Sequence, residues 1–214
     1  MRLPEPRVRA TALPYNRLSW QVVSYEPLFA PGTLDITQER RTMRQFRAPT
    51  LPNLSTLLWH TARCQETLPS PPGFDLQRRP APSGGAIHPI HLLIERPEFE
   101  TWARYDPRAH RLEHLHDATA LCGAREGAAE YVDPSEGILV LFAAEPGMTS
   151  AKYEDAASIV WRDAGVLQGL MTHLAPQAGL GCCLLGMTAD RYVEPLGQKG
   201  QLIGVGVAIL GAPR

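Results

Sequence analysis

The sequence KYEDAASIVWRDAGVLQGLMTHLAPQAGLG occupies residues 152–181 and indicates the core of the fold. Its apolar residues recur at three- and four-residue spacing, which predicts a helix with one buried stripe. The stripe consists of Ala156, Ile159, Val160, Ala164, Leu167, Leu170, Met171 and Leu174. Pro176 cannot continue this helix, so we expect it to stop or kink before Gly179. We interpret the segment as the central buried helix.

Apolar runs on both sides of this helix predict buried strands. Residues 137–144 and 202–210 are continuously apolar, and 90–95 and 101–105 are also strand-like. Upstream, Thr50 is expected to cap a second helix. Its buried face would consist of Leu54, Leu57, Leu58 and Ala62.

Two proline-rich stretches are expected to lie outside the regular structure. Residues 65–82 predict a loop, because prolines lack a backbone donor and have a restricted φ angle. Residues 1–35 are expected to form an arm that lies on another surface, such as a partner subunit, and not a separate domain. This leaves one domain over residues 36–214.

Composition narrows the classes of protein. The 21 Lys and Arg residues balance 22 Asp and Glu residues, for a net charge of -1, which argues against nucleic acid as a partner. The 4 cysteines show no C-x-x-C spacing, so neither a disulfide framework nor a zinc knuckle is expected. With no signal-like segment and no apolar run of about 20 residues, we expect a cytoplasmic protein without a membrane span.

Histidine pairs are the only other pattern that suggests metal binding. His88 with His91, and His114 with His116, lack a third ligand nearby in the sequence. We therefore expect no metal site.

Three short segments contain residue types suited to a flavin. Arg40, Arg41, Thr42 and Arg44 can hold a phosphate through guanidinium and hydroxyl donors, although such a loop is also compatible with a solvated basic surface. Residues 82–85, Pro-Ser-Gly-Gly, would let backbone amides approach a flat ring, but they also suit a common turn. Residues 179–181, Gly-Leu-Gly, fit either a second flavin contact or a helix C-cap.

Lys152 and Tyr153 stand directly before the predicted central helix. Taken alone, they are compatible with an exposed lysine and a packing tyrosine. The order along the chain is more specific: basic loop, glycine turn, Lys-Tyr pair, buried helix and second glycine turn follow one another.

With this order, residues 36–212 resemble the nitroreductase-like flavoenzymes, and within them the SagB-type branch of azoline and peptide-heterocycle dehydrogenases. The resemblance implies an α+β nitroreductase-like fold, with a central mixed or antiparallel sheet flanked by helices. It also implies FMN as cofactor and a homodimer with FMN at the subunit interface.

The resemblance also assigns cofactor contacts. Arg40, Arg41, Thr42 and Arg44 match the loop that holds the FMN phosphate and ribityl chain, and Arg214 loosely matches a terminal phosphate arginine. Pro82, Ser83, Gly84, Gly85 and His88 match the segment beside the flavin ring. Leu185 and Gly186 fall in the turn that faces the other ring edge.

Lys152 and Tyr153 match a pair implicated in proton removal by peptide-azoline dehydrogenases. The resemblance therefore implies an FMN-dependent dehydrogenase that converts a thiazoline or oxazoline, in a peptide or carrier-protein-bound substrate, to the aromatic azole, with other biosynthetic enzymes as further partners. Two alternatives remain open. One is an NAD(P)H-dependent reductase of nitro, quinone or activated-alkene substrates, and the other is a flavin-free scaffold subunit of a biosynthetic complex.

Overall fold

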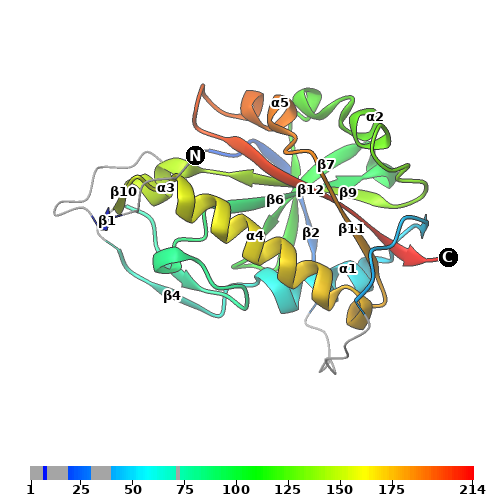
Figure 1. The fold of residues 1–214 in the computed structure, drawn as a ribbon, viewed down its shortest axis with the longest axis horizontal. Helices are drawn as coiled ribbons and strands as arrows, with labels where there is room; N and C mark the ends of the chain where they lie inside the picture. The colour runs from blue at the N-terminus through cyan, green and yellow to red at the C-terminus, as the bar shows by residue number, and fades with distance from the viewer. Residues whose placement is uncertain (1–6, 9–18, 30–39, 71–72) are drawn as a thin grey trace.

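The computed structural model describes residues 7–8, 19–29, 40–70 and 73–214. Its centre is a sheet with the strand order β11-β12-β9-β6-β7-β8-β2, and β3 pairs with the end of β12 (Figure 1). The strands of this sheet are β2 (Val22–Pro27), β3 (Phe46–Arg47), β6 (Ile90–Arg96), β7 (Thr101–Asp106), β8 (Arg111–Leu115), β9 (Ile138–Ala144), β11 (Gly181–Leu185) and β12 (Ile203–Pro213). All of its strand pairs are antiparallel, which agrees with the expected α+β class.

Helices cover both faces of the sheet. The α-helices are α1 (Leu51–Ala62), α2 (Ala124–Ala129), α3 (Pro146–Ser150), α4 (Ala157–Leu174) and α5 (Asp190–Val193). Single 3-10 turns are η1 (Gly84–Ala86), η2 (Pro97–Phe99), η3 (Thr119–Leu121), η4 (Pro176–Ala178) and η5 (Glu194–Leu196). Figure 1 shows α4 crossing one face of the sheet. Helices α2 and α5 lie at the top of the same view.

Strand β9 explains why the sheet has two cores. Its side chains alternate between faces, as they do in any strand. Val140 and Phe142 pack in the cluster beneath α1 and α4, whereas Leu139 and Leu141 pack in the cluster beneath α2 and α5. Both faces are therefore buried, which is why the segment is continuously apolar.

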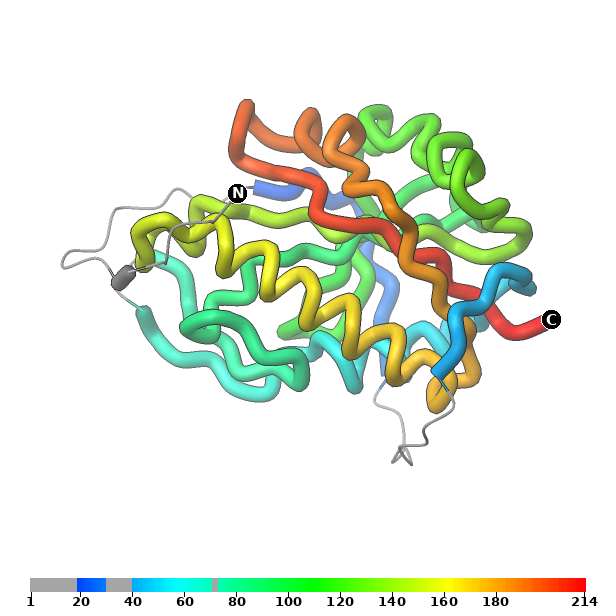
Figure 2. The backbone as a smooth tube through the Cα atoms, in the orientation of Figure 1, coloured from blue at the N-terminus to red at the C-terminus, as the bar shows by residue number. Residues whose placement is uncertain are grey.

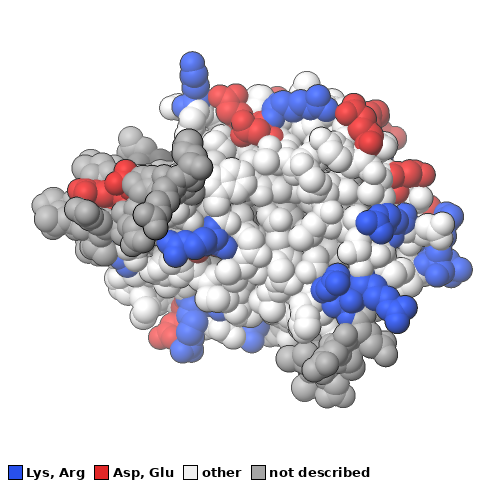
Figure 3. Space-filling view, viewed as in Figure 1, with Lys and Arg blue, Asp and Glu red and all other residues white. Residues whose placement is uncertain are grey.

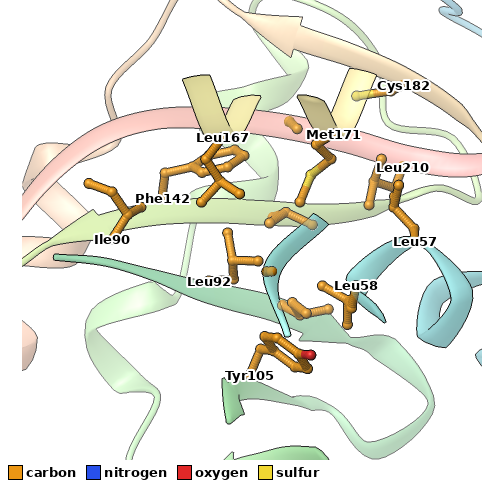
Figure 4. Close-up of a cluster of buried hydrophobic side chains, with 14 of the residues drawn as sticks. Leu57, Leu58, Ile90, Leu92, Tyr105, Phe142, Leu167, Met171, Cys182 and Leu210 are labelled. Carbon is orange, nitrogen blue, oxygen red and sulfur yellow. The ribbon is translucent and has the colours of Figure 1, made fainter. Parts of the chain in front are cut away.

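The core beneath α1 and α4 joins side chains from distant parts of the chain (Figure 4). Leu57 and Leu58 from α1 lie with Leu167 and Met171 from α4, above Phe142 of β9. Leu57, Leu58, Phe142 and Met171 are fully buried. Each such side chain contributes about 1.5–3 kcal/mol relative to an exposed one.

Both predicted helices form where their patterns indicated. The Thr50 hydroxyl accepts a hydrogen bond from the Asn53 backbone amide at 3.3 Å and caps α1. The predicted stripe of α4 is buried, apart from partly buried Leu170. α4 ends at Leu174 before Pro176, and Gly179 then adopts a left-handed φ of 70°.

Two expectations about proline-rich stretches were wrong in part. Residues 65–82 contain a hairpin of β4 (Glu66–Leu68) and β5 (Leu76–Arg78), because the prolines at 69–72 and 80–82 fall outside both strands and leave their ladder intact. Within the predicted arm, β2 pairs with β8 and extends the central sheet, so this part of the arm is integrated in the domain. Most of residues 1–18 and 30–39 lie outside the described residues.

Three smaller features complete the fold. β1 (Arg7–Val8) pairs with β10 (Tyr153–Glu154). All 4 cysteines are free thiols. In the part of the chain that the structure describes, no helix is long and apolar enough to cross a membrane.

Candidate functional site

The glycine turn is anchored to the first half of α4. The Ser83 hydroxyl donates to Asp163 Oδ2 at 2.5 Å, and the Gly84 amide donates to Asp163 Oδ1 at 2.9 Å. Ser83 Oγ also accepts a hydrogen bond from the His88 amide at 2.9 Å. A Cβ atom at Gly84 would lie 2.5 Å from Ile159 Cγ2, so only glycine lets the turn approach the helix this closely.

Asp163 is a functional candidate that the sequence interpretation missed. Burial raises the pKa of its carboxyl, while the hydrogen bonds from Ser83 and Gly84 oppose that shift. A signal was present, because Asp163 lies next to Ala164, between Val160 and Leu167, and therefore on the buried face of the helix. A carboxylate on a buried face requires a polar partner, and here the glycine turn is that partner.

Lys152 and Tyr153 meet the same turn from the other side. Lys152 Nζ donates to the Gly85 carbonyl at 3.4 Å, and it lies 5.6 Å from the centre of the Tyr153 ring. Gly85 has a left-handed φ of +66°, and a Cβ there would lie 2.6 Å from Tyr153 Oη and 2.9 Å from Lys152 Nζ. Tyr153 itself packs against a small buried cluster that includes Ile87. Tertiary structure thus brings together a lysine, a phenol and a bare glycine backbone.

The predicted phosphate loop lies beside β11. Thr42 forms a parallel bridge with Cys182, and the Met43 amide donates to the Cys182 carbonyl at 3.2 Å. Arg40, Arg41 and Arg44 are exposed, and no carboxylate among the described residues forms an ion pair with them. Three exposed guanidinium groups and a threonine hydroxyl are a donor set suited to a phosphate.

Cys182 and Cys183 are packing residues in this structure. Both thiols are buried. Burial raises the pKa of Cys182 to about 12, although the nearby charge of Arg40 opposes the shift. Burial also raises the pKa of Cys183, so both remain protonated at neutral pH.

The remaining predicted contacts lie at opposite ends of β11: Leu185 and Gly186 at its last residue, and Arg214 beyond its first residue. Leu185 is half-buried at the end of β11, and Gly186 is exposed beyond it. Arg214 follows β12, whose last residues pair with β3 directly after the phosphate loop. Its guanidinium pairs with Glu136 at 3.0 Å and is mostly exposed. Figure 2 shows the segment after residue 40 running alongside the C-terminal strand.

His88, expected beside the flavin ring, lines internal cavities together with Arg79. Its side chain is buried, and it is hydrogen bonded to the backbone of Gln77. Burial, together with the nearby charge of Arg79, lowers the pKa of His88 to about 3, so the ring is neutral. Of the other histidines considered as ligands, His91 pairs with Glu145 at 2.9 Å. Within the described ranges, no group of 3 or more potential ligands could hold a metal ion.

The predicted residues therefore form two groups. The glycine-turn group comprises residues 82–85 with Lys152 and Tyr153, and it contacts the first half of α4. The arginine group comprises residues 40–44 and lies by the start of β11, beyond the end of α4, whereas Leu185 and Gly186 lie at the other end of β11. From Asp163 to Leu174 the helix rises about 16 Å, at roughly 1.5 Å per residue. The two groups lie at opposite ends of α4 (Figure 1).

Both groups fit parts of an FMN molecule. The arginine group supplies exposed cationic donors for a phosphate. The glycine-turn group supplies a backbone without side chains, and a Cβ atom at Gly84 or Gly85 would clash with its neighbours. The arginine group lies by β11 and the glycine-turn group lies against the first half of α4, so the two donor sets are on different parts of the protomer.

Comparison with protein families adds independent information. The model of the Nitroreductase family matches residues 37–199, which is most of the chain. No curated protein sequence matches the chain.

Several solved structures share this fold at low sequence identity. A candidate nitroreductase from Ralstonia eutropha JMP134 is 20% identical, with a TM-score of 0.66 over 95% of this chain and 98% of that one. A candidate nitroreductase from Anabaena variabilis ATCC 29413 is 22% identical, with a TM-score of 0.61 over 75% of this chain and 34% of that one. A chain of the Escherichia coli microcin synthetase McbBCD complex, with truncated pro-MccB17 bound, is 20% identical, with a TM-score of 0.57 over 88% of this chain and 78% of that one. These likenesses confirm the expected nitroreductase fold.

Proposed function

The chain belongs to the Nitroreductase family of oxidoreductases, and we propose that it is an FMN-dependent dehydrogenase that oxidises a thiazoline or oxazoline to the aromatic azole. The observation that carries the proposal is the placement of Lys152 and Tyr153 against the Gly85 backbone. A reducing enzyme that draws its electrons from a nicotinamide would not need this pair. The SagB-type branch is thus the part of the family that we favour.

The arginine group would hold the phosphate of FMN, with Arg40, Arg41 and Arg44 as charged donors and Thr42 as a hydroxyl donor. Residues 82–85 would lie along the ring, and Leu185 and Gly186 would border its other edge. Arg214 would join the phosphate contacts if it left Glu136, from which it is 3.0 Å away. When bound, FMN supplies the acceptor for the hydride that leaves the substrate.

Lys152 and Tyr153 would remove the proton. An azoline ring becomes aromatic by losing one hydrogen as a proton and one as a hydride. Tyr153 Oη or the Lys152 amine would accept the proton, because both atoms lie at the Gly85 backbone where the ring segment of the site begins. The 3.4 Å hydrogen bond to the Gly85 carbonyl orients the lysine. The small cluster beneath Tyr153 holds the phenol in place.

A second copy of the chain would complete each site. The outer face of α4 exposes Trp161 (45%) and Val166 (40%), and a Cβ atom at Gly165 or Gly169 would meet no atom within 4 Å. Figure 3 shows that the centre of this face is largely uncharged and that most charged side chains lie at its rim. Exposed apolar residues with two glycines one turn apart suit close helix packing. A homodimer across α4 would bring the arginine group of one protomer to the glycine-turn group of its partner.

The substrate would be a peptide or a carrier-bound group. The fold is shared with a chain of a microcin synthetase complex that has a truncated pro-MccB17 bound. By analogy, further biosynthetic enzymes would be partners of this chain. The low identity of 20% limits that comparison to the fold, so the substrate class rests on the lysine–tyrosine pair.

The test combines cofactor binding with substrate oxidation. Wild-type protein loaded with FMN should oxidise an azoline-containing peptide in air, whereas the Lys152→Ala/Tyr153→Phe variant should retain FMN and lose oxidation. A matched control is the Lys199→Ala/Tyr25→Phe variant, which changes the same residue types at positions outside the proposed site and should be fully active. Full activity of the first variant would contradict the assignment.

Two other outcomes would favour the alternatives. Rapid reduction of bound FMN by NADPH, with turnover of a nitroaromatic compound, would favour a nitro, quinone or alkene reductase, which the family match also allows. Failure to bind FMN at high concentration would favour a flavin-free scaffold subunit.

The dimer has its own test. Gly165→Glu places a charge on the outer face of α4 without a clash inside the protomer, because nothing lies within 4 Å of a Cβ there. We expect a folded monomer in light scattering, with FMN affinity lowered at least 10-fold. The control is Ala129→Glu on the exposed side of α2, which should remain dimeric. A dimeric Gly165→Glu variant with normal FMN affinity would refute this interface.

A further inference from the structure

A polar cavity of about 160 Å³ lies behind the glycine turn, between the sheet and the helices α1 and α4. Its charged lining includes Arg79, Arg104 and Arg108. A smaller cavity of about 20 Å³ also borders Arg79 and extends to Ser83 and Asp163. The polar cavity is thus separate from the arginine and glycine-turn groups but close to the anchor of the glycine turn.

Among the described residues, Arg79 is the arginine of this cavity that has no acidic partner. Its Nε donates to Gln77 Oε1 at 2.9 Å, which is a neutral partner and leaves both terminal nitrogens available. No carboxylate in the described ranges forms an ion pair with it. Arg104 pairs with Glu113, yet its own Nε is buried without a hydrogen-bond partner. The cavity therefore contains unused cationic donors.

The acidic residues that line the cavity have partners other than Arg79. Asp106 pairs with Arg111 at 3.3 Å, and Glu145 pairs with His91 at 2.9 Å. The ring of His88 is neutral, as shown above. The guanidinium groups that act on Arg79 are those of Arg104 and Arg108, and both add positive charge to its surroundings.

These surroundings have an energetic consequence. Burial lowers the pKa of Arg79 to about 10, and the positive charges of Arg104 and Arg108 act in the same direction. The guanidinium nonetheless remains charged at neutral pH. A buried charge without a counterion is costly, and an anion in the cavity would offset that cost.

The other walls identify the kind of anion. Ile90, Leu92, Leu167 and Met148 line the same cavity with apolar surface. An inorganic phosphate would leave these walls without contacts, whereas a carboxylate with a short hydrocarbon part would use both surfaces. The two free terminal nitrogens of Arg79 match the two oxygens of a carboxylate.

We propose that the cavity is a binding site for a small organic carboxylate, held by Arg79 with Arg104 beside it. The site does not depend on the proposed oxidation of azolines or on bound FMN. Its position behind Ser83 and Asp163 would let an occupant support the glycine turn from the inside.

The first experiment uses the full chain and measures butyrate binding by calorimetry and by thermal stabilisation. Butyrate should bind wild-type protein, while butyramide, its neutral counterpart, should not. Arg79→Gln should weaken butyrate binding at least 10-fold. Arg78→Gln is the matched control, because Arg78 is the neighbouring arginine with a side chain 69% exposed and paired with Glu66, and this variant should bind normally.

Three results would overturn the proposal: equal binding by Arg79→Gln, equal binding of butyramide, or equal stabilisation by phosphate at the same ionic strength. A second measurement avoids substitution altogether, in case Arg79→Gln does not fold. Butyrate should shift the imidazole NMR signals of His88 and His91, which line the cavity, but not that of His173 on α4. Unchanged His88 and His91 signals at saturating butyrate would reject the site.

Discussion

Replacing Gly85 with alanine tests whether the Lys152–Tyr153 pair depends on a bare backbone at this turn. Gly85 has a φ of +66°, and a Cβ there would lie 2.6 Å from Tyr153 Oη. An ordinary contact begins near 3.4 Å, so the phenol or the turn must move by about 0.8 Å (3.4 − 2.6). The left-handed backbone costs an alanine about 1–2 kcal/mol. A displacement near 1 Å at a reacting group lowers a rate by up to about 100-fold.

The structure contains a matched control for the backbone effect. Gly200 has a φ of +76°, but a Cβ there would meet no atom within 4 Å. Gly200→Ala should therefore lose about 1–2 kcal/mol, or roughly 2–8 °C in Tm. Gly85→Ala should lose more than this in urea denaturation. It should also oxidise an azoline peptide at least 10-fold more slowly with FMN still bound.

Equal stability of the Gly85→Ala and Gly200→Ala variants would show that the pair does not press on the turn, and would refute the packing argument. A normal oxidation rate in a destabilised Gly85→Ala variant would instead refute only the catalytic role. The stability comparison is independent of the proposed reaction. The two lines of reasoning can therefore fail separately.

Three further predictions concern other parts of the site. Asp163→Ala leaves the donors of Ser83 and Gly84 without their acceptor and should cost about 2–4 kcal/mol in urea denaturation; a loss below 1 kcal/mol would contradict the anchoring role. Because the native pKa of His88, about 3, lies below its ordinary value of 6.5, its contribution to stability is present above pH 6.5 and is lost as the pH falls towards 3. Asn tolerates the φ of 54° found at His88. In the His88→Asn variant, the free energy of unfolding should fall less steeply below pH 6.5, by up to about 1.4 kcal/mol per pH unit, and an unchanged pH dependence would contradict this. Arg44→Gln should weaken FMN binding about 10-fold in a fluorescence titration, with a smaller salt dependence, whereas Arg47→Gln should not.

Local sequence patterns predicted the elements that depend on neighbouring residues. The cap at Thr50 and the stripe of α4 follow from hydrogen bonding and periodicity within a few residues. The continuous apolar run of β9 likewise indicated burial on both faces. The hairpin in residues 65–82 was missed because the stretch as a whole is rich in proline, although β4 ends before Pro69 and β5 lies between Pro72 and Pro80.

The candidate site required tertiary structure. The motifs indicated which segments matter, but not that Gly85 and Tyr153, 68 positions apart, would be in contact, or that Asp163 would anchor the turn. Nor did they indicate that the arginine and glycine-turn groups lie at opposite ends of α4. The sequence by itself determined the two long helices α1 and α4, the buried strands β9 and β12 and the family, because these depend on local spacing and residue type. Only the tertiary structure decided which side chains meet, because contacts between distant residues depend on how the layers pack.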